Sequence, residues 1–97
     1  MNELDNEALM LARGKFSTVR ASHEDAKKNL QILCGQLSSI ASKILRQMQP
    51  DNEDVPVSVS MLIEEGRNAL FKIEATTKEI ESLAIHRAAL RGEAWPK

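Results

Sequence analysis

Three side chains of this 97-residue sequence have the chemistry of a nucleophile or a general base: Cys34, His23 and His86. His23 stands beside Glu24 and Asp25, where we expect a helix to begin, and a solvated imidazole is the ordinary outcome at such a position. His86 lies toward the polar flank of a second expected helix. Cys34 falls among regularly spaced apolar residues, where a free cysteine usually behaves as a small hydrophobic side chain. These residues do not make a catalytic set, and we expect no enzymatic activity.

Metal and phosphate sites need closer groups of ligands than the sequence provides. Ligands on one helix face repeat every three or four residues. Glu79 and Glu81 with His86 do not have this spacing, and Glu64 and Glu65 are neighbours that point in different directions. The four glycines are isolated, so the sequence has no glycine-rich phosphate loop. We therefore predict neither a metal nor a cofactor.

The charges are divided unevenly along the chain. Residues 13–46 hold seven basic and two acidic side chains, whereas residues 51–81 hold eight acidic and three basic ones. The basic stretch lacks interleaved aromatic residues that stack on bases, and the whole chain has a formal net charge of -1. A solvated helix face is therefore a better interpretation than a nucleic-acid site. Opposite charges on the two stretches favour their pairing, within one molecule or between two.

The composition favours a helical fold. Apolar residues make up 42% of the sequence and charged residues 28%, which is typical of a globular chain. Only Phe16, Phe71 and Trp95 are aromatic, whereas sheets prefer aromatic and β-branched residues. We expect one all-α domain over residues 1–97. The sequence has a single cysteine, no secretory leader and no apolar run of about 18 residues, so we expect a cytoplasmic protein that does not enter a membrane.

A first long helix is predicted over about residues 23–49. Between Ala26 and Met48 the apolar residues follow one another in steps of three and four, which is the spacing of one helix face. Ser22 can cap the start of this helix. Pro50 would end it, because a proline disfavours helical angles in the residue before it.

A second long helix is predicted over about residues 60–91, where the same spacing returns with one gap at Arg87. Gly92 would end it and leave a tail over residues 92–97. Two long helices in so short a chain predict an antiparallel helical hairpin, with the acidic, proline-containing segment 50–59 as its connection. The alternative is that a partner recognises this connection directly.

A short N-terminal helix is predicted over about residues 3–13, with Gly14 as its terminator and with Phe16 and Val19 in a connector. The alternative is a frayed extension of the first long helix. The expected fold class is therefore all-α: an antiparallel hairpin of two long helices plus a short N-terminal helix.

Several apolar residues are left over when the two long helices pair. Ile32 lies roughly opposite the main apolar stripe of the first helix, and Phe71, Ile85 and Ala89 form a second line on the other helix. Trp95, the only tryptophan, either covers the end of the helix pair or anchors an interface. These five residues are our candidates for binding a partner.

The functional expectation is a non-enzymatic protein–protein interaction domain that binds a larger protein. Small chains without a catalytic set include inhibitors and adaptors made by bacteria or their phages, for example ones that block a host nuclease or defence factor. The alternative is a structural homo-oligomer, either a coiled-coil or a four-helix dimer. A helical nucleic-acid binder is the third candidate.

Overall fold

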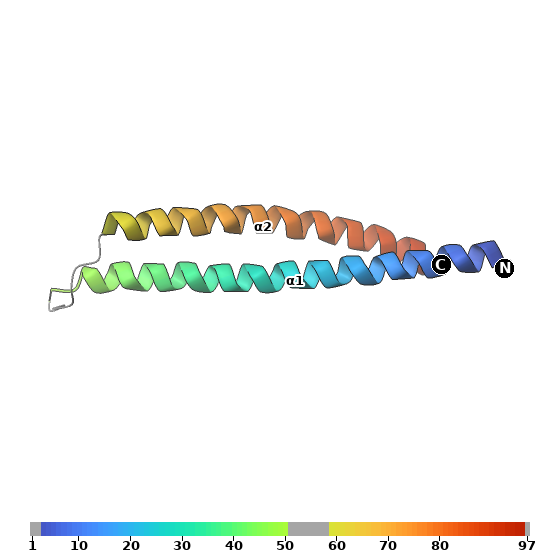
Figure 1. Ribbon diagram of the computed structural model, residues 1–97, viewed down its shortest axis with the longest axis horizontal. Helices are drawn as coiled ribbons and strands as arrows, with labels where there is room; N and C mark the ends of the chain where they lie inside the picture. Colours follow the sequence, from blue (N-terminus) through green and yellow to red (C-terminus); the bar gives the residue numbers. More distant parts are fainter. Residues whose placement is uncertain (1–2, 51–58, 97) are drawn as a thin grey trace. The chain divides into compact units, whose positions relative to one another are not determined.

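The computed structural model describes residues 3–50 and 59–96, and the side chains from Asp5 onward. Two helices make up almost all of this part of the chain: α1, Glu3–Gln47, and α2, Val59–Ala94 (Figure 1). The described residues contain no strand, so the prediction of an all-α fold is confirmed. Residues 51–58 of the acidic connection lie outside the described residues, and its role stays a prediction.

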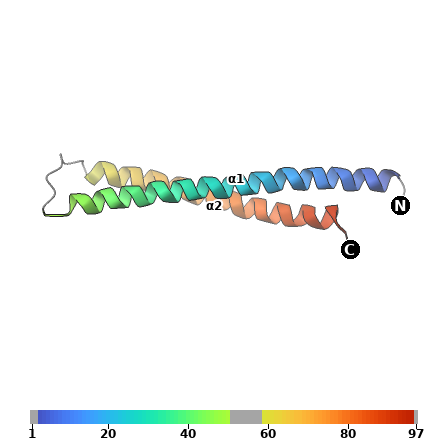
Figure 2. The same cartoon turned by 90° about the horizontal axis from the view of Figure 1, so that it is seen from below.

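The two helices pack against each other in opposite directions. Arg13 bonds to Ala94 and His23 to Arg87, so positions further along α1 meet positions earlier on α2. The chain divides into two compact units: unit 1 is Met1–Lys28 with Thr77–Lys97, and unit 2 is Asn29–Thr76. Each unit contains a stretch of α1 and a stretch of α2 (Figures 1 and 2). The predicted hairpin of two long helices is confirmed.

Burial follows a single stripe along each helix. Successive buried or half-buried positions alternate steps of three and four, an average of 3.5 that is characteristic of helices packed side by side. Apart from Thr77, every buried or half-buried residue of the described helices belongs to this stripe. We call its members the seam residues. In unit 1 they are Leu9, Ala12, Phe16, Val19, His23, Ala26, Ile80, Leu83, Arg87, Leu90 and Ala94; in unit 2 they are Leu30, Leu33, Leu37, Ile40, Ile44, Gln47, Val59, Leu62, Gly66, Ala69, Ile73 and Thr76.

The seam of unit 2 packs large side chains on small ones. A Cβ atom added to Gly66 would lie 3.7 Å from Cγ2 of Ile40 and 4.0 Å from Cδ1 of Leu37. Ala69, one turn later on α2, is also buried. The small residues on α2 therefore allow close packing of the branched side chains on α1.

The prediction of a separate helix over residues 3–13 is wrong. α1 runs through Gly14, which has no positive φ, and continues to Gln47. Phe16 and Val19, expected in a connector, are seam residues, and Ser22 is exposed in the middle of the helix. A glycine inside a helix costs only about 1 kcal/mol relative to alanine, whereas burying a phenylalanine side chain contributes about 1.5 to 3 kcal/mol. Packing against α2 therefore outweighs the local signal for a helix end.

Prolines follow the ends of both helices. After α1, the Met48 amide donates to the Leu45 carbonyl at 3.1 Å, a three-residue turn that precedes Pro50. The stop before Pro50 is confirmed, two residues earlier than expected. Gly92, in contrast, does not end α2, because the helix continues to Ala94. The Trp95 amide still donates to the Arg91 carbonyl at 3.0 Å, and Pro96 provides the stop.

Two neighbouring residues test the seam directly. Leu62 is 2% exposed and Ile63 is 44% exposed, although their side chains have similar volumes. Leu62→Ala should lower the free energy of unfolding by about 2 to 5 kcal/mol, because it leaves a cavity between the helices. Ile63→Ala should change it by no more than about 0.5 kcal/mol. Urea unfolding of both variants measures the difference, and equal losses would contradict the assigned seam.

Candidate functional site

Aromatic and arginine side chains gather in unit 1, where the first part of α1 packs against the last part of α2. Phe16 is buried, and its ring centroid lies 5.1 Å from that of Trp95 in an edge-to-face arrangement. Trp95 remains half exposed. We call the group the arginine–aromatic cluster; its members are Arg13, Phe16, Arg20, Arg87, Arg91 and Trp95.

Three of the arginines lie over aromatic rings. Cζ of Arg13 is 5.5 Å from the centroid of Trp95, and its Nε donates to the Ala94 carbonyl at 3.2 Å. Cζ of Arg20 and Cζ of Arg87 are each 5.8 Å from the centroid of Phe16. These distances fit cation–π contacts, which contribute about 0.5 to 1 kcal/mol each at exposed sites. The rings therefore hold the guanidinium groups in place.

A groove of about 430 Å³ opens beside these contacts, lined by Phe16, Arg20, Arg87, Arg91 and Trp95. The only carboxylate within ion-pair range of the cluster, among the described residues, is that of Glu24, whose Oε1 lies 4.0 Å from Nη1 of Arg87. The structure shows no ion pair between the guanidinium group of Arg20 or Arg91 and a carboxylate of the described residues. The groove has the chemistry of an anion site.

His23 was expected to be solvated at a helix start, and this is wrong, since it is a buried seam residue inside α1. Nη1 of Arg87 lies 3.2 Å from its Nδ1. A guanidinium group has no acceptor, so Nδ1 accepts and the neutral ring carries its proton on Nε2. Burial lowers the pKa of His23 from its usual 6.5; Lys27 and Arg87 lower it further, while Glu24 acts in the opposite direction. The structure therefore favours the neutral imidazole.

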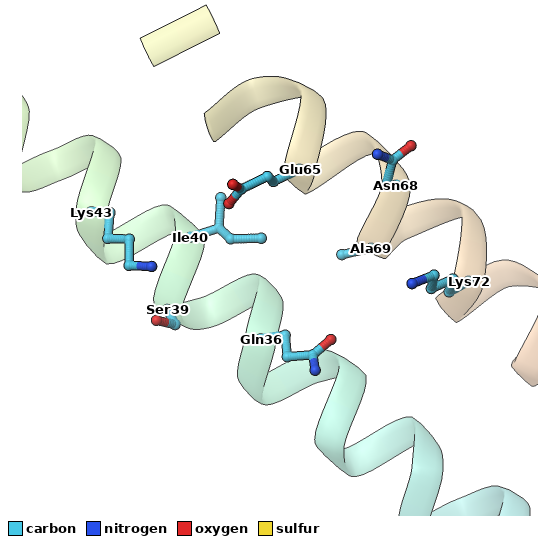
Figure 3. A pocket seen from close by; sticks show the side chains of 8 residues that line it. All are labelled: Gln36, Ser39, Ile40, Lys43, Glu65, Asn68, Ala69 and Lys72. Carbon is cyan, nitrogen blue, oxygen red and sulfur yellow. The ribbon is translucent and has the colours of Figure 1, made fainter. Parts of the chain in front are cut away.

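Unit 2 has a polar groove of about 420 Å³ on one edge of its seam (Figure 3). Gln36, Ser39 and Lys43 line it from α1, and Glu65, Asn68 and Lys72 line it from α2. Ile40 and Ala69 lie between these two rows. Its lining mixes both charge signs, which is the ordinary arrangement beside a helix seam.

The opposite edge of the seam in unit 2 is apolar. Four residues come two positions before residues that line the polar groove: Cys34, Ala41, Ile63 and Leu70. Because two positions correspond to about 200° round a helix, these four side chains lie on the edge opposite the groove. All four are exposed. We call them the apolar edge. The expectation that Cys34 is a buried hydrophobic residue is wrong, because it lies beside the seam and not within it.

The five candidate partner-binding residues all lie outside the seam. Phe71 in unit 2 is 73% exposed and Ile85 in unit 1 is 74% exposed; Ile32 and Ala89 are exposed as well. Of these five residues, Trp95 is the one whose ring contacts other side chains, those of Phe16 and Arg13. The structure does not bring Ile32 and Ile85 into one unit, and their role as binding residues stays a prediction.

Sequence reasoning missed the arginine–aromatic cluster and the apolar edge. A signal for the cluster was present: Arg13 and Arg20 are seven residues apart, and Arg87 and Arg91 are four apart, so each pair shares a helix face. To predict that the two pairs meet, one must know which positions of α1 lie beside which positions of α2, and the sequence does not give this register. Unit 1 also has an apolar groove of about 520 Å³, lined in part by Met10, Leu11, Val19, His86 and Leu90.

His86 is exposed, as expected from its place on the polar flank of α2. The described residues contain no cluster of three or more potential metal ligands. Within the same residues, neither helix has an apolar stretch long enough to cross a membrane. No protein-family model matches this chain, and no curated protein or solved structure shows a significant similarity to it.

The buried His23 predicts a loss of stability in mild acid. Because its pKa in the folded chain is below 6.5, the unfolded chain takes up a proton first as the pH falls, and the folded state is progressively disfavoured. This contribution to stability is fully present above about pH 6.5 and is lost as the pH falls toward the lowered pKa. The urea midpoint should therefore drop between pH 7.5 and pH 5.5.

His23→Gln should remove most of this pH dependence, since glutamine does not titrate and can still accept from Arg87. His86→Gln is the matched control, because it removes an exposed imidazole from the same unit and should leave the drop intact. An unchanged drop in His23→Gln would contradict the assigned environment.

Proposed function

We propose that this chain is a non-enzymatic protein-interaction module that binds a helix of a larger protein along its apolar edge. The observation that carries the proposal is the exposure of Ile63 and Leu70 directly beside the seam, with Cys34 and Ala41 on the same edge. Among the positions that directly flank the seam of unit 2, the apolar ones lie on this edge, whereas those on the opposite edge, Gln36, Lys43, Glu65 and Lys72, are polar and line the groove. One-sided apolar surface next to a helix pair is typical of an interface.

A helix fits this edge better than an extended segment does. Helices that face the core of a bundle carry apolar residues at the two seam positions and at one flanking position as well. Unit 2 has this wider pattern on both helices, but a two-helix pair covers only the seam. A third helix placed along Ile63 and Leu70 would cover the remainder, as an amphipathic helix does in a groove.

A larger protein fits the edge better than a second copy of this chain. A standard stable interface covers about 800 Å² on each partner. The apolar edge has four side chains, of which Cys34 and Ala41 are small, and a symmetric pair of copies would offer the same small surface twice. A larger partner can bring bulkier apolar side chains and make further contacts elsewhere.

The outer line with Phe71 and Ile85 is a second surface, but charged residues interrupt it. At the same helical position, seven residues apart, come Glu64, Phe71, Lys78 and Ile85 in turn. An uninterrupted apolar edge buries a partner helix without desolvating charges, so we place the interface there. The narrower role of inhibitor or adaptor, and a host nuclease or defence factor as the partner, stay predictions from small size.

Substitution of Leu70 tests the proposal. Leu70→Asp puts a negative charge on the apolar edge, and Asn68→Asp puts the same charge on the polar edge two residues away. Proteins retained from the native host by the wild-type chain and by Asn68→Asp, but not by Leu70→Asp, are purified and titrated one by one in a calorimeter. One of them should bind both chains with similar dissociation constants, and Leu70→Asp at least about tenfold more weakly.

Three outcomes would overturn the proposal. Retention of the same proteins by Leu70→Asp would remove the edge from the interface. Loss of binding in Phe71→Asp with full binding in Leu70→Asp would move the interface to the outer line. A stable dimer of the wild-type chain in light scattering, dissociated by Leu70→Asp, would make the second copy the occupant. Circular dichroism of each variant must show unchanged helicity.

A further inference from the structure

We propose that unit 1 carries a binding site for the acidic side chains of a peptide, in the groove lined by Phe16, Arg20, Arg87, Arg91 and Trp95. This site lies in a different unit from the apolar edge and shares no residue with it, so each can be tested without the other.

The charges around the groove are the first reason. Positions that flank the seam of paired helices usually carry opposite charges, which form ion pairs between the helices. Arg20 from α1 and Arg91 from α2 line one groove with the same charge. Like charges that line one groove repel each other in the free chain, and a bound anion offsets this repulsion with attraction to both.

The fixed position of Arg87 is the second reason. Its guanidinium group lies 3.2 Å from Nδ1 of His23, 4.0 Å from a carboxylate oxygen of Glu24 and 5.8 Å from the Phe16 centroid. These contacts orient its remaining donors before a ligand arrives, which lowers the entropic cost of binding. A guanidinium group binds a carboxylate with two parallel hydrogen bonds, and Arg20 and Arg91 can add further ones.

The aromatic wall is the third reason. Phe16 and the half-exposed Trp95 give the groove an apolar side next to its charged one. An apolar wall excludes water from a bound carboxylate and strengthens its hydrogen bonds to the guanidinium groups. It also offers a surface for the apolar stem of a glutamate, or for an apolar residue next to it in the peptide.

The surroundings favour a short acidic peptide over nucleic acid. Glu24 and Asp25 follow Arg20 on α1, and Glu93 follows Arg91 on α2. Carboxylates thus border the groove on both helices, although Arg13 and Lys27 continue the seven-residue spacing of Arg20 along α1. A nucleic-acid backbone has a negative charge at every phosphate and would meet these carboxylates beyond the groove. A peptide can place one or two carboxylates in the groove and leave the flanks untouched.

Trp95 makes the test direct, because it is the only tryptophan in the chain and lines the groove itself. Acetylated and amidated hexaglutamate is the probe, hexaglutamine is its neutral match, and hexathymidylate is the nucleic-acid probe. Hexaglutamate should change the Trp95 emission saturably and raise the melting temperature, since a ligand that binds only the folded chain stabilises it. Added salt should weaken the effect.

Arg91→Gln is the informative variant, because the structure shows no hydrogen bond or ion pair from the Arg91 side chain to another described residue that the change would break. It should weaken hexaglutamate binding at least about tenfold, and it should leave the melting temperature of the free chain unchanged or higher. Arg67→Gln removes an exposed arginine from unit 2 and should bind like the wild type.

A wild-type chain without saturable binding would overturn the proposal, and so would equal losses in Arg91→Gln and Arg67→Gln. Tighter binding of hexathymidylate than of hexaglutamate would replace the acidic peptide with nucleic acid. Leu70→Asp should bind hexaglutamate like the wild type. An experiment that contradicts the proposed role of the apolar edge can therefore be distinguished from one that contradicts this acidic-peptide site.

Discussion

Each helix of this chain can bury one narrow stripe, because it has a single helix to pack against. The alternation of three and four residues between buried positions keeps that stripe facing its neighbour in both units. The same spacing decides which small residues sit under large ones, as Gly66 does near Ile40. It also decides what is left outside: among the residues whose side chains are described, every apolar one off the stripe is exposed.

The seam is not uniform in its chemistry. In unit 2 it is almost entirely aliphatic, whereas in unit 1 it includes His23 and Arg87. Burying a polar group without a partner costs about 1 to 3 kcal/mol, so either residue alone would weaken the packing of α1 against α2 in this unit. Together they form a hydrogen bond, and the Phe16 ring lies against the guanidinium group. The polar pair sits beside the arginine-lined groove, while the aliphatic seam sits beside the apolar edge. Each of the two candidate surfaces therefore lies beside a seam of different composition.

The parts of the fold predicted correctly from sequence are those in which local and tertiary signals agree. The aliphatic steps from Leu30 to Ile44 and the stop before Pro50 are examples. Prediction failed at Gly14, Ser22 and Gly92, because each resembles a helix boundary locally while the seam continues past it. The apolar spacing is interrupted at Arg87 in the sequence, but its hydrogen-bond partner, His23, is 64 residues away and could not be predicted from one helix. The exposed Phe71 and Ile85 could be found from one helix alone, whereas the arginine–aromatic cluster requires the register between two.

α1 is one helix, and the seam holds its first part against the end of α2. Nuclear Overhauser spectroscopy tests this packing most directly, because Trp95 is the only tryptophan and Phe16 and Phe71 are the only phenylalanines. With ring centroids 5.1 Å apart, Phe16 and Trp95 should give a strong cross-peak between their ring protons, and this peak should persist in Phe71→Leu. Absence of the cross-peak in a helical, monomeric sample would mean that the part of α1 containing Phe16 does not pack against the end of α2, contrary to the structure.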